Sequence, residues 1–329
     1  MLKRMILAAA SLPAALLLGE LAARWSGRAP EMTLITAGRF RLSSNPAIGY
    51  EPVPYFEHHG DKEEYFEFQG RSNNLGFRDR DHARQKEPYA CRILVLGDSL
   101  TMGLYIERTE DVFTSVLERT LAERGRRAEV LNFGVSGYNT RQEVATLIEK
   151  GLEYEPDVVV LAYCLNDVEE MNGGIMTRLR VEKKERGGIE RSMLPPWLAR
   201  SALYRLVYSR WLSASAEKER KDLRMKLKQD TVEPSLRLLR ETAAERGFKT
   251  VVAVFPPRED RRSPERLRRI TELCASNGFA CLDLQPVFDG QAAVSGENLM
   301  HDGWHPSVAG HLFAGRALAE YLMGNRLVP

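Results

Sequence analysis

The sequence has almost no excess of charge of either sign. Its 329 residues include 47 lysines and arginines and 45 aspartates and glutamates, so the net charge is +2. Domains that bind nucleic acid carry a clustered basic excess, and we therefore expect no nucleic acid among the partners. Hydrophobic residues make up 43% of the chain, which is typical of a globular protein with a sizeable core.

Cysteine is scarce as well, with four residues in the whole chain. So few cysteines exclude the disulfide framework of a small secreted domain. Cys91 and Cys164 adjoin apolar runs and are expected to be buried thiols. Cys274 and Cys281 flank a predicted helix end. They either form a disulfide or occupy core positions on a helix and a strand, and the sequence leaves both readings open.

Two widespread enzyme signatures are missing. The stretch 97–103 contains glycines but no lysine, which argues against a phosphate-binding loop. The Gly-x-Ser-x-Gly elbow is also absent, because Leu100 and Thr101 follow Ser99, and the segment around Ser136 lacks the final glycine. The usual α/β-hydrolase arrangement is therefore disfavoured.

The N-terminus has the pattern of an export signal. Lys3 and Arg4 precede an apolar run over residues 5–19, and Trp25 closes the segment. A positive start followed by such a run is typical of a signal peptide, and residues 1–25 approach the length of a membrane helix. We expect an uncleaved inner-membrane signal anchor, with a cleaved signal peptide or a buried helix as alternatives. Either export signal places the remaining chain in the periplasm or another extracytoplasmic space.

Residues 26–88 are expected to form an irregular lead-in with a small strand pair that packs against the main domain. Aromatic residues over 63–69 favour β-structure, and residues 72–76 have the composition of a turn. Further along, about residues 169–235, we expect a helical insertion. Its segment 197–212 is rich in aromatic and aliphatic residues, and it either packs on the core or forms a lid beside the site.

A different pattern runs through residues 89–329. Short apolar runs alternate with amphipathic helical segments, which is typical of a parallel sheet covered on both faces. The runs cover residues 92–97, 129–133, 157–163, 250–255 and 280–284. We predict an α/β domain, a three-layer α/β/α sandwich with a five-stranded, mostly parallel sheet.

Four polar segments follow predicted strands, at the edge of the sheet where active sites of such folds lie. Ser99 comes directly after the first run, and Gly137 lies in a glycine-containing segment after the second. Asn166 follows the third run, and Asp302 and His305 follow the fifth. Each segment alone is weak evidence, whereas all four in this order are specific.

Together these residues predict acyl-transfer chemistry. A serine hydroxyl becomes nucleophilic when a histidine takes its proton and a carboxylate orients that histidine. We assign these roles to Ser99, His305 and Asp302. The backbone N–H groups of Ser99 and Gly137 and the amide of Asn166 are expected to form an oxyanion hole, a contribution of about 3 kcal/mol for each donor.

The four segments resemble the sequence blocks of the SGNH/GDSL hydrolase superfamily, which is named for its serine, glycine, asparagine and histidine. The resemblance implies a flavodoxin-like α/β fold. It also implies the roles given above for Ser99, Gly137 and Asn166, and for Asp302 and His305, which match the family's Asp-x-x-His block.

The resemblance spans about residues 90–320 and includes one departure from the family pattern. The third block usually reads Gly-x-Asn-Asp, whereas Cys164 stands in place of the glycine here. The lead-in segment 74–78, which reads NLGFR, and the N-terminal segment resemble membrane-associated bacterial members of the superfamily.

We expect a serine esterase that cleaves an acyl ester, such as an acetyl ester, of a carbohydrate, a lipid or another small molecule. Two alternatives stay open. An O-acyltransferase acting on an envelope or secreted polysaccharide uses the same acyl-enzyme and differs only in the second nucleophile. A non-catalytic carbohydrate-binding protein on the same fold is disfavoured, because both nucleophile and base are present.

A metal centre is the remaining alternative for the C-terminal block. His301 and His305 lie four residues apart, which on a helix would put two imidazoles on one face as zinc ligands. Gly303 and Pro306 argue against a helix here, and no third ligand cluster is evident. We therefore expect neither a metal nor another cofactor.

Overall fold

The computed structural model describes residues 2–27, 39–59, 69–88, 90–165, 201–204, 206–207, 210–211, 231–256 and 263–329. The chain divides into two compact units. The smaller unit joins residues 1–37 with 173–227, and the larger one joins residues 38–172 with 228–329.

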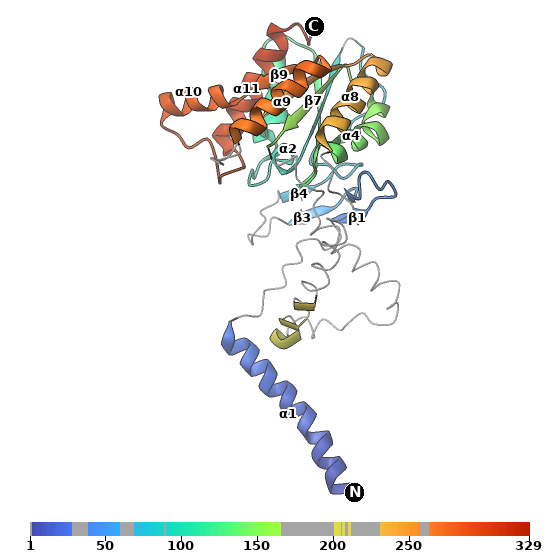
Figure 1. Ribbon diagram of the computed structural model, residues 1–329, viewed down its shortest axis with the longest axis vertical. Helices are drawn as coiled ribbons and strands as arrows, with labels where there is room; N and C mark the ends of the chain where they lie inside the picture. Colours follow the sequence, from blue (N-terminus) through green and yellow to red (C-terminus); the bar gives the residue numbers. More distant parts are fainter. Residues whose placement is uncertain are drawn as a thin grey trace. The chain divides into compact units, whose positions relative to one another are not determined.

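A five-stranded sheet forms the centre of the larger unit (Figure 1). Its strands are β5 (Cys91–Gly97), β6 (Ala128–Gly134), β7 (Val158–Tyr163), β8 (Lys249–Val254) and β9 (Ala280–Asp283). The spatial order is β6-β5-β7-β8-β9, and every neighbouring pair is parallel. Strands β5 and β7 are buried along their whole length, as expected for a sheet covered on both faces. The predicted five-stranded α/β fold is confirmed.

Helices cover both faces of this sheet (Figure 1). Helices α3 (Phe113–Glu123) and α11 (Val308–Gly324) pack together on one face. Helix α10 (Gln285–Ser295) contacts α11. The other face carries α4 (Thr140–Glu149), η2 (Gly151–Tyr154), α8 (Val232–Arg246) and α9 (Ser263–Asn277). Right-handed crossovers explain why the helices are divided between the two faces. β6 and β7 lie on opposite sides of β5, so the chain reverses its direction across the sheet after β6, and the helices between β6 and β9 pack on the other face.

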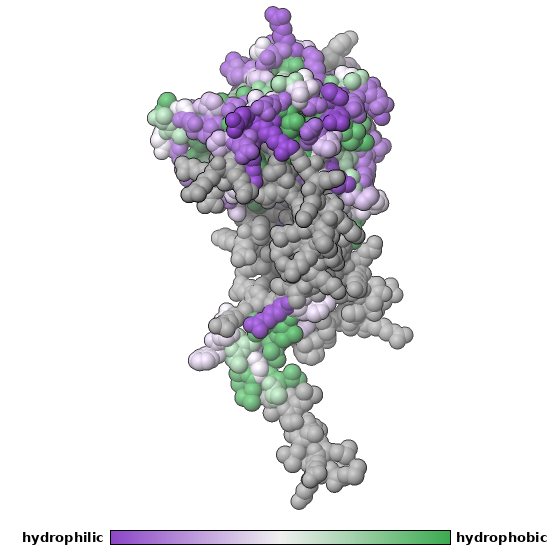
Figure 2. Space-filling view, in the orientation of Figure 1, coloured by the Kyte–Doolittle hydropathy of each residue, from purple (hydrophilic) through white to green (hydrophobic). Residues whose placement is uncertain are grey.

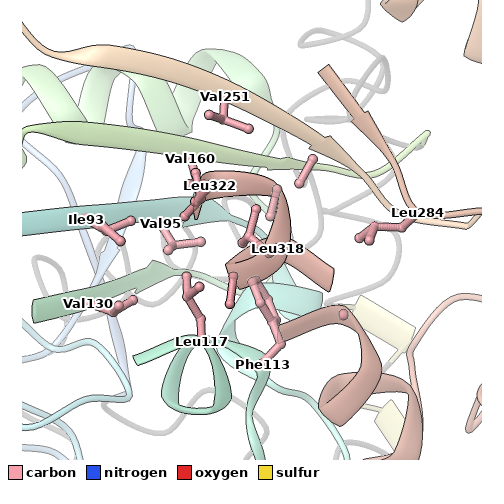
Figure 3. Packing of buried hydrophobic residues seen from close by; sticks show 14 of the residues in the cluster. Ile93, Val95, Phe113, Leu117, Val130, Val160, Val251, Leu284, Leu318 and Leu322 are labelled. Atoms are coloured by element: carbon pink, nitrogen blue, oxygen red, sulfur yellow. The ribbon is translucent and has the colours of Figure 1, made fainter. Parts of the chain in front are cut away.

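The core under α3 and α11 is made by every second residue of the strands, because successive strand side chains point to opposite faces. Figure 3 shows these side chains meeting those of the two helices. The wholly buried members include Ile93, Val95, Val160, Val251, Leu117, Leu318 and Leu322. This packing holds α11, and with it the loop before α11, against the sheet.

A buried histidine joins the same two helices. His311 of α11 accepts a hydrogen bond at Nδ1 from the backbone N–H of Phe113, at 3.1 Å. Complete burial, with smaller contributions from the charges of Arg78 and His305, lowers the pKa of His311 to about 3. His311 is therefore neutral at physiological pH and acts as a polar link between α3 and α11.

Two short antiparallel strand pairs stand in the lead-in, where one pair was expected. Strand β1 (Phe40–Leu42) pairs with β2 (Tyr50–Pro52), and β3 (Glu57–His59) pairs with β4 (Gln69–Arg71). The stretch 63–69, which suggested β-structure, lies outside the described residues except for Gln69.

A buried polar cluster ties the lead-in to the sheet. His82 bonds to Asp79 at 3.0 Å and to Glu129 at 2.6 Å, and Arg92 donates to Glu129 at 2.8 Å. Burial alone would lower the pKa of His82, but the bonds to the two carboxylates outweigh it and raise that pKa. Asp79 also accepts the backbone N–H of Asn132 in β6, at 2.7 Å. The lead-in therefore supports the strand end that carries the second predicted site segment.

The four cysteines, all of them in described parts of the chain, form no disulfide. Cys91 and Cys164 are buried, as predicted. Cys274 is buried in α9, whereas Cys281 is only partly buried in β9, so the core position is confirmed for Cys274 alone. Their thiols are hydrogen-bonded to each other, so that the pKa of Cys274 is raised and that of Cys281 is lowered.

The smaller unit contains helix α1 (Leu2–Ser26), with Pro13 inside it. Among the described residues, no helix has the length and hydrophobicity needed to cross a bilayer. Figure 2 shows a largely hydrophobic surface on the described part of this helix. Most of the predicted insertion 169–235 lies outside the described residues; within 197–212, residues 202–204, 206–207 and 210–211 are helical.

Candidate active site

The serine predicted as nucleophile stands at the sharp turn between β5 and α2 (Ser99–Met102). Asp98 caps this short helix, since its carboxylate accepts the backbone N–H of Leu100 at 2.9 Å. Gly103 ends the helix in the left-handed region, with φ 83°. Ser99 is half-buried at the first position of the helix, so the turn presents its hydroxyl at the carboxyl edge of the sheet.

Glycine is required where α2 crosses the strand ends. A Cβ on Gly134 of β6 would collide with the backbone N of Met102, and a Cβ on Gly97 would collide with the side chain of Thr101. The amide of Asn132 closes the same junction by donating to the Thr101 carbonyl at 2.9 Å. The absence of side chains at Gly97 and Gly134 therefore lets the turn that carries Ser99 lie directly on β5 and β6.

The loop between α10 and α11 brings a histidine and an aspartate to this turn. Ser99 Oγ lies 2.9 Å from His305 Nε2, although the two residues are 206 positions apart in the chain. His305 Nδ1 lies 2.9 Å from Asp302 Oδ2. The structure thus joins hydroxyl, imidazole and carboxylate in one hydrogen-bonded line.

The aspartate of this line is itself held firmly. Its Oδ1 accepts the backbone N–H groups of Trp304 at 2.6 Å and of His305 at 2.7 Å. Partial burial would raise the pKa of Asp302, but the hydrogen bonds from His305 and Trp304 outweigh it, and the pKa lies below its usual value. Asp302 is therefore ionised over the neutral pH range and faces the histidine as a carboxylate.

Gly137 lies in the turn between β6 and α4, with φ 77°, a backbone conformation that favours glycine. Two lead-in contacts hold this turn. Tyr50 Oη donates to the carbonyl of Ser136 at 2.7 Å, and Tyr138 Oη donates to the carbonyl of Tyr50 at 2.6 Å. Asn139 then caps α4 with a reciprocal bond to Gln142. The turn lies at the same edge of the sheet as Ser99, because β5 and β6 are parallel.

The remaining predicted donor, Asn166, lies outside the described residues, which reach Leu165 after β7. Cys164, which replaces the glycine of the family pattern, is buried. The metal alternative finds no support among the described residues, where no group of three or more potential ligands occurs. His301 and His305 lie in a non-helical loop, so their spacing does not create a shared helix face.

Sequence reasoning missed the residues that support the site from the lead-in and from the turn after α2. Asp79 holds β6 through Asn132, as described above. Arg78 is almost completely buried and donates to the carbonyls of the turn after α2. In the sequence, the segment 74–78 indicates only a resemblance to family members. A signal was present, because an arginine in an apolar and glycine-containing segment needs partners when it is buried.

A hydroxyl, an imidazole and a carboxylate in line at the carboxyl edge of an α/β sheet define the class of enzymes that transfer acyl groups through a serine. The chain matches the model of the GDSL-like lipase/acylhydrolase family over residues 95–312. It belongs to this family and is a hydrolase that acts on ester bonds.

Several solved structures are similar to this chain. TesA shares 20% identity, with 71% of this chain and 98% of that chain covered and a TM-score of 0.43. The lipase/acylhydrolase from Enterococcus faecalis shares 20% identity, with 73% and 97% covered and a TM-score of 0.43. The acetyl xylan esterase AlAXEase shares 14% identity, with 69% and 97% covered and a TM-score of 0.43. A search of curated proteins finds no match.

Proposed function

We propose that the protein is a serine esterase that removes an acyl group, such as acetyl, from a carbohydrate or lipid ester through an acyl-enzyme on Ser99. The observation that supports this proposal is the line of contacts from Ser99 Oγ to His305 Nε2 and from His305 Nδ1 to Asp302 Oδ2, both at 2.9 Å. The chemistry of each step follows from the protonation states that this line allows.

In the first half-reaction, His305 Nε2 takes the proton of the Ser99 hydroxyl as the oxygen attacks the ester carbonyl carbon. Asp302 accepts a hydrogen bond from the Nδ1–H of the imidazole and stays a carboxylate, which leaves Nε2 free to act as the base and stabilises the imidazolium that forms. The tetrahedral intermediate then collapses, and the imidazolium gives its proton to the departing alcohol. A water molecule then attacks the acyl-enzyme in the same way, with His305 again as the base, and this step releases the free acid and restores the Ser99 hydroxyl.

The negative oxygen of the tetrahedral intermediate requires donors that already point at it. We assign this role to the backbone N–H groups of Ser99 and Gly137 and to the side-chain amide of Asn166. The left-handed backbone at Gly137 supports its part of the assignment, since no side chain then blocks the approach of substrate to the N–H.

Exposure of the base favours hydrolysis over acyl transfer to a second alcohol. The side chain of Asp302 is 37% exposed and that of His305 is 17% exposed. Water that reaches the imidazole can be activated for attack on the acyl-enzyme. A transferase has to exclude water in favour of a sugar hydroxyl, so this access supports the esterase.

The full chain, purified in detergent, is expected to hydrolyse p-nitrophenyl acetate, because the two contacts above join the three groups that carry the proton transfer. A panel of longer p-nitrophenyl esters, an acetylated polysaccharide and a diacylglycerol, each with and without an acceptor sugar, defines the acyl group and the second nucleophile. Free acid as the main product in the presence of acceptor supports the esterase. Acyl groups recovered mainly on the acceptor would make the protein an O-acyltransferase, and binding of the polysaccharide without turnover would contradict both.

We also propose that the protein is exported and that α1 stays attached to it as a membrane tether. Within the smaller unit, the carboxylate of Glu20 accepts the Ser201 hydroxyl at 2.7 Å and the backbone N–H groups of Ala202 and Leu203 at 2.9 Å each. These three bonds, together with one from Arg24, lower the pKa of Glu20 to about 2. A helix that serves as the capping partner of a later segment has a structural role after export. Its exposed apolar side chains fit contact with lipid: Leu16, Leu17, Leu18, Leu21 and Trp25.

The mature protein isolated from cells is therefore expected to retain residues 1–25 in the membrane fraction, because cleavage after Ala23 would remove Glu20 from Ser201. Intact mass and N-terminal sequencing measure this directly. The Glu20→Ala variant should be cut faster by added protease within residues 201–211, whereas Glu123→Ala, at the exposed end of α3, should not. A mature chain that begins near Ser26 would show that the segment is a cleaved signal peptide.

A further inference from the structure

The turn that follows the nucleophile helix is held by a buried arginine from the lead-in. The side chain of Arg78, which is 2% exposed, donates from Nη1 to the carbonyl of Gly103 at 2.7 Å and from Nη2 to the carbonyl of Ile106 at 2.6 Å. A weaker bond runs from Nη2 to the carbonyl of Glu107 at 3.2 Å. A guanidinium presents its donors in a rigid planar fork, so these bonds set the path of the backbone between residues 103 and 106.

Tyr105 lies inside the turn that Arg78 holds. Its φ is 67°, in the left-handed region that residues with a side chain adopt rarely. The bonds of Arg78 reach the carbonyls on either side of this residue. A disfavoured backbone conformation persists only where its surroundings enforce it, and such positions cluster at functional sites. The left-handed backbone of Tyr105 thus points its ring in a direction that a residue with negative φ would not give.

The ring of Tyr105 contacts both histidines of the loop before α11. It stacks on His301 with ring centroids 4.2 Å apart and planes at 12°, and it meets His305 edge to face at 5.3 Å and 79°. The two histidines are joined in turn, since the backbone N–H of His301 donates to the carbonyl of His305 at 2.8 Å. One side chain from the nucleophile turn therefore contacts the loop at two points.

The contacts among Ser99, His305 and Asp302 do not by themselves fix the orientation of the imidazole toward Ser99. Ser99 belongs to a turn after β5, whereas His305 belongs to a loop 206 residues later that is partly exposed at Asp302. Proton transfer from Ser99 needs the imidazole at a defined distance and tilt, and a displacement of about 1 Å can lower a rate by about 100-fold. The ring of Tyr105, which packs against the imidazole of His305, restricts both its distance and its tilt.

We propose that Tyr105 is a positioning residue that sets the orientation of His305 toward Ser99, and that Arg78 holds Tyr105 in the conformation required. This inference rests on the proposed function, in which His305 is the base. Tyr105 acts through His305 on the proton transfer, so it affects the chemical step and leaves the binding of substrate largely unchanged.

Tyr105→Ala is expected to lower kcat for p-nitrophenyl acetate by about 10- to 100-fold with KM within about threefold of the wild type. Tyr105→Phe keeps the ring and should stay within about threefold in kcat, because the contacts to the histidines are ring contacts. The kcat of Arg78→Lys should be lowered toward that of Tyr105→Ala, since a single ammonium group cannot reproduce the planar fork of donors that the guanidinium provides.

Tyr55→Ala is the matched control. Tyr55 also has a left-handed backbone, with φ 57°, and its exposed ring lies in the lead-in beside Arg71. The substitution removes a tyrosine from the same backbone conformation, so a general effect on folding would appear in both variants. We expect no change in kcat for Tyr55→Ala.

The imidazole resonances of His301 and His305 give a readout that does not depend on turnover. Loss of the ring should shift both resonances in Tyr105→Ala and neither in Tyr55→Ala. Shifted resonances together with kcat within twofold of the wild type would overturn the positioning role, as would a rise in KM with unchanged kcat. Wild-type protein that neither hydrolyses esters nor reacts at Ser99 with a fluorophosphonate would overturn the proposed function, and the positioning role with it.

Discussion

The Ser99→Ala variant is expected to lose ester hydrolysis, with kcat lower by about 10⁴- to 10⁶-fold. The substitution removes the oxygen that forms the acyl-enzyme, and His305 is left without a proton to accept. The hydroxyl of Ser99 bonds to His305 rather than to the core, so its removal should leave thermal unfolding close to that of the wild type. Initial rates with p-nitrophenyl acetate, together with a melting curve, measure both effects.

Two comparisons make this result specific to the nucleophile. Ser276→Ala removes an exposed hydroxyl from α9 and should leave kcat unchanged. A fluorophosphonate should label wild-type protein on Ser99 and leave Ser99→Ala unlabelled, as judged by peptide mass. Label on Ser136, or turnover retained in Ser99→Ala, would show that the reaction does not pass through the serine of the β5–α2 turn.

Asp302→Asn has the second largest expected effect, a loss in kcat of about 10³- to 10⁴-fold at neutral pH. An amide in place of the carboxylate no longer requires a proton on His305 Nδ1, so the imidazole can present its proton at Nε2 toward Ser99. Such a tautomer cannot take the serine proton. The carboxylate charge that stabilises the imidazolium in the transition state is lost as well.

The pH dependence of the wild type provides a second measure of the same residue. Hydrogen bonds from His305 and Trp304 hold the pKa of Asp302 below its usual value of 3.8, against the opposing effect of burial. A depressed pKa keeps the carboxylate charged as the pH falls toward that usual value, so protonation of Asp302 should not limit activity between pH 5 and 8, a range well above that value.

Asp289→Asn in α10 is the matched control, because Asp289 is an exposed carboxylate that bonds to Gln285 outside the site. It should retain wild-type kcat and pH dependence. Full activity of Asp302→Asn at neutral pH would contradict the role of Asp302 as the orienting carboxylate.

The fold was predictable because its signals are local. Each central strand is a short apolar run, and each helix carries an apolar face, so that composition and periodicity alone locate the strands. The order of the strands in the sheet is less local, yet right-handed crossovers and the parallel pattern restrict it. The predicted runs 92–97, 129–133, 157–163, 250–255 and 280–284 each overlap an observed strand.

The lead-in was predicted less well for the opposite reason. Its strands are three residues long, too short for a periodic pattern, and they are stabilised by contacts with distant residues. Tyr50 reaches Ser136, and Asp79 reaches Asn132, across 86 and 53 positions respectively. In the sequence, Arg78 looks like a surface arginine. Only the structure shows that its guanidinium donates to carbonyls of the turn after α2. A local pattern can indicate that such a side chain needs partners, but it does not specify which distant residues those partners are.

The sequence by itself predicted which residues carry the chemistry, because a serine after the first strand and an Asp-x-x-His block near the C-terminus supply the groups that acyl transfer requires. It also placed them at the ends of strands. Only the tertiary structure decided how they meet: the 2.9 Å approach of Ser99 to His305, the ring of Tyr105 between the two loops, and the support from Arg78. The reason is physical, since residues far apart in sequence are brought to catalytic distance by packing, and packing is a property of the folded chain as a whole.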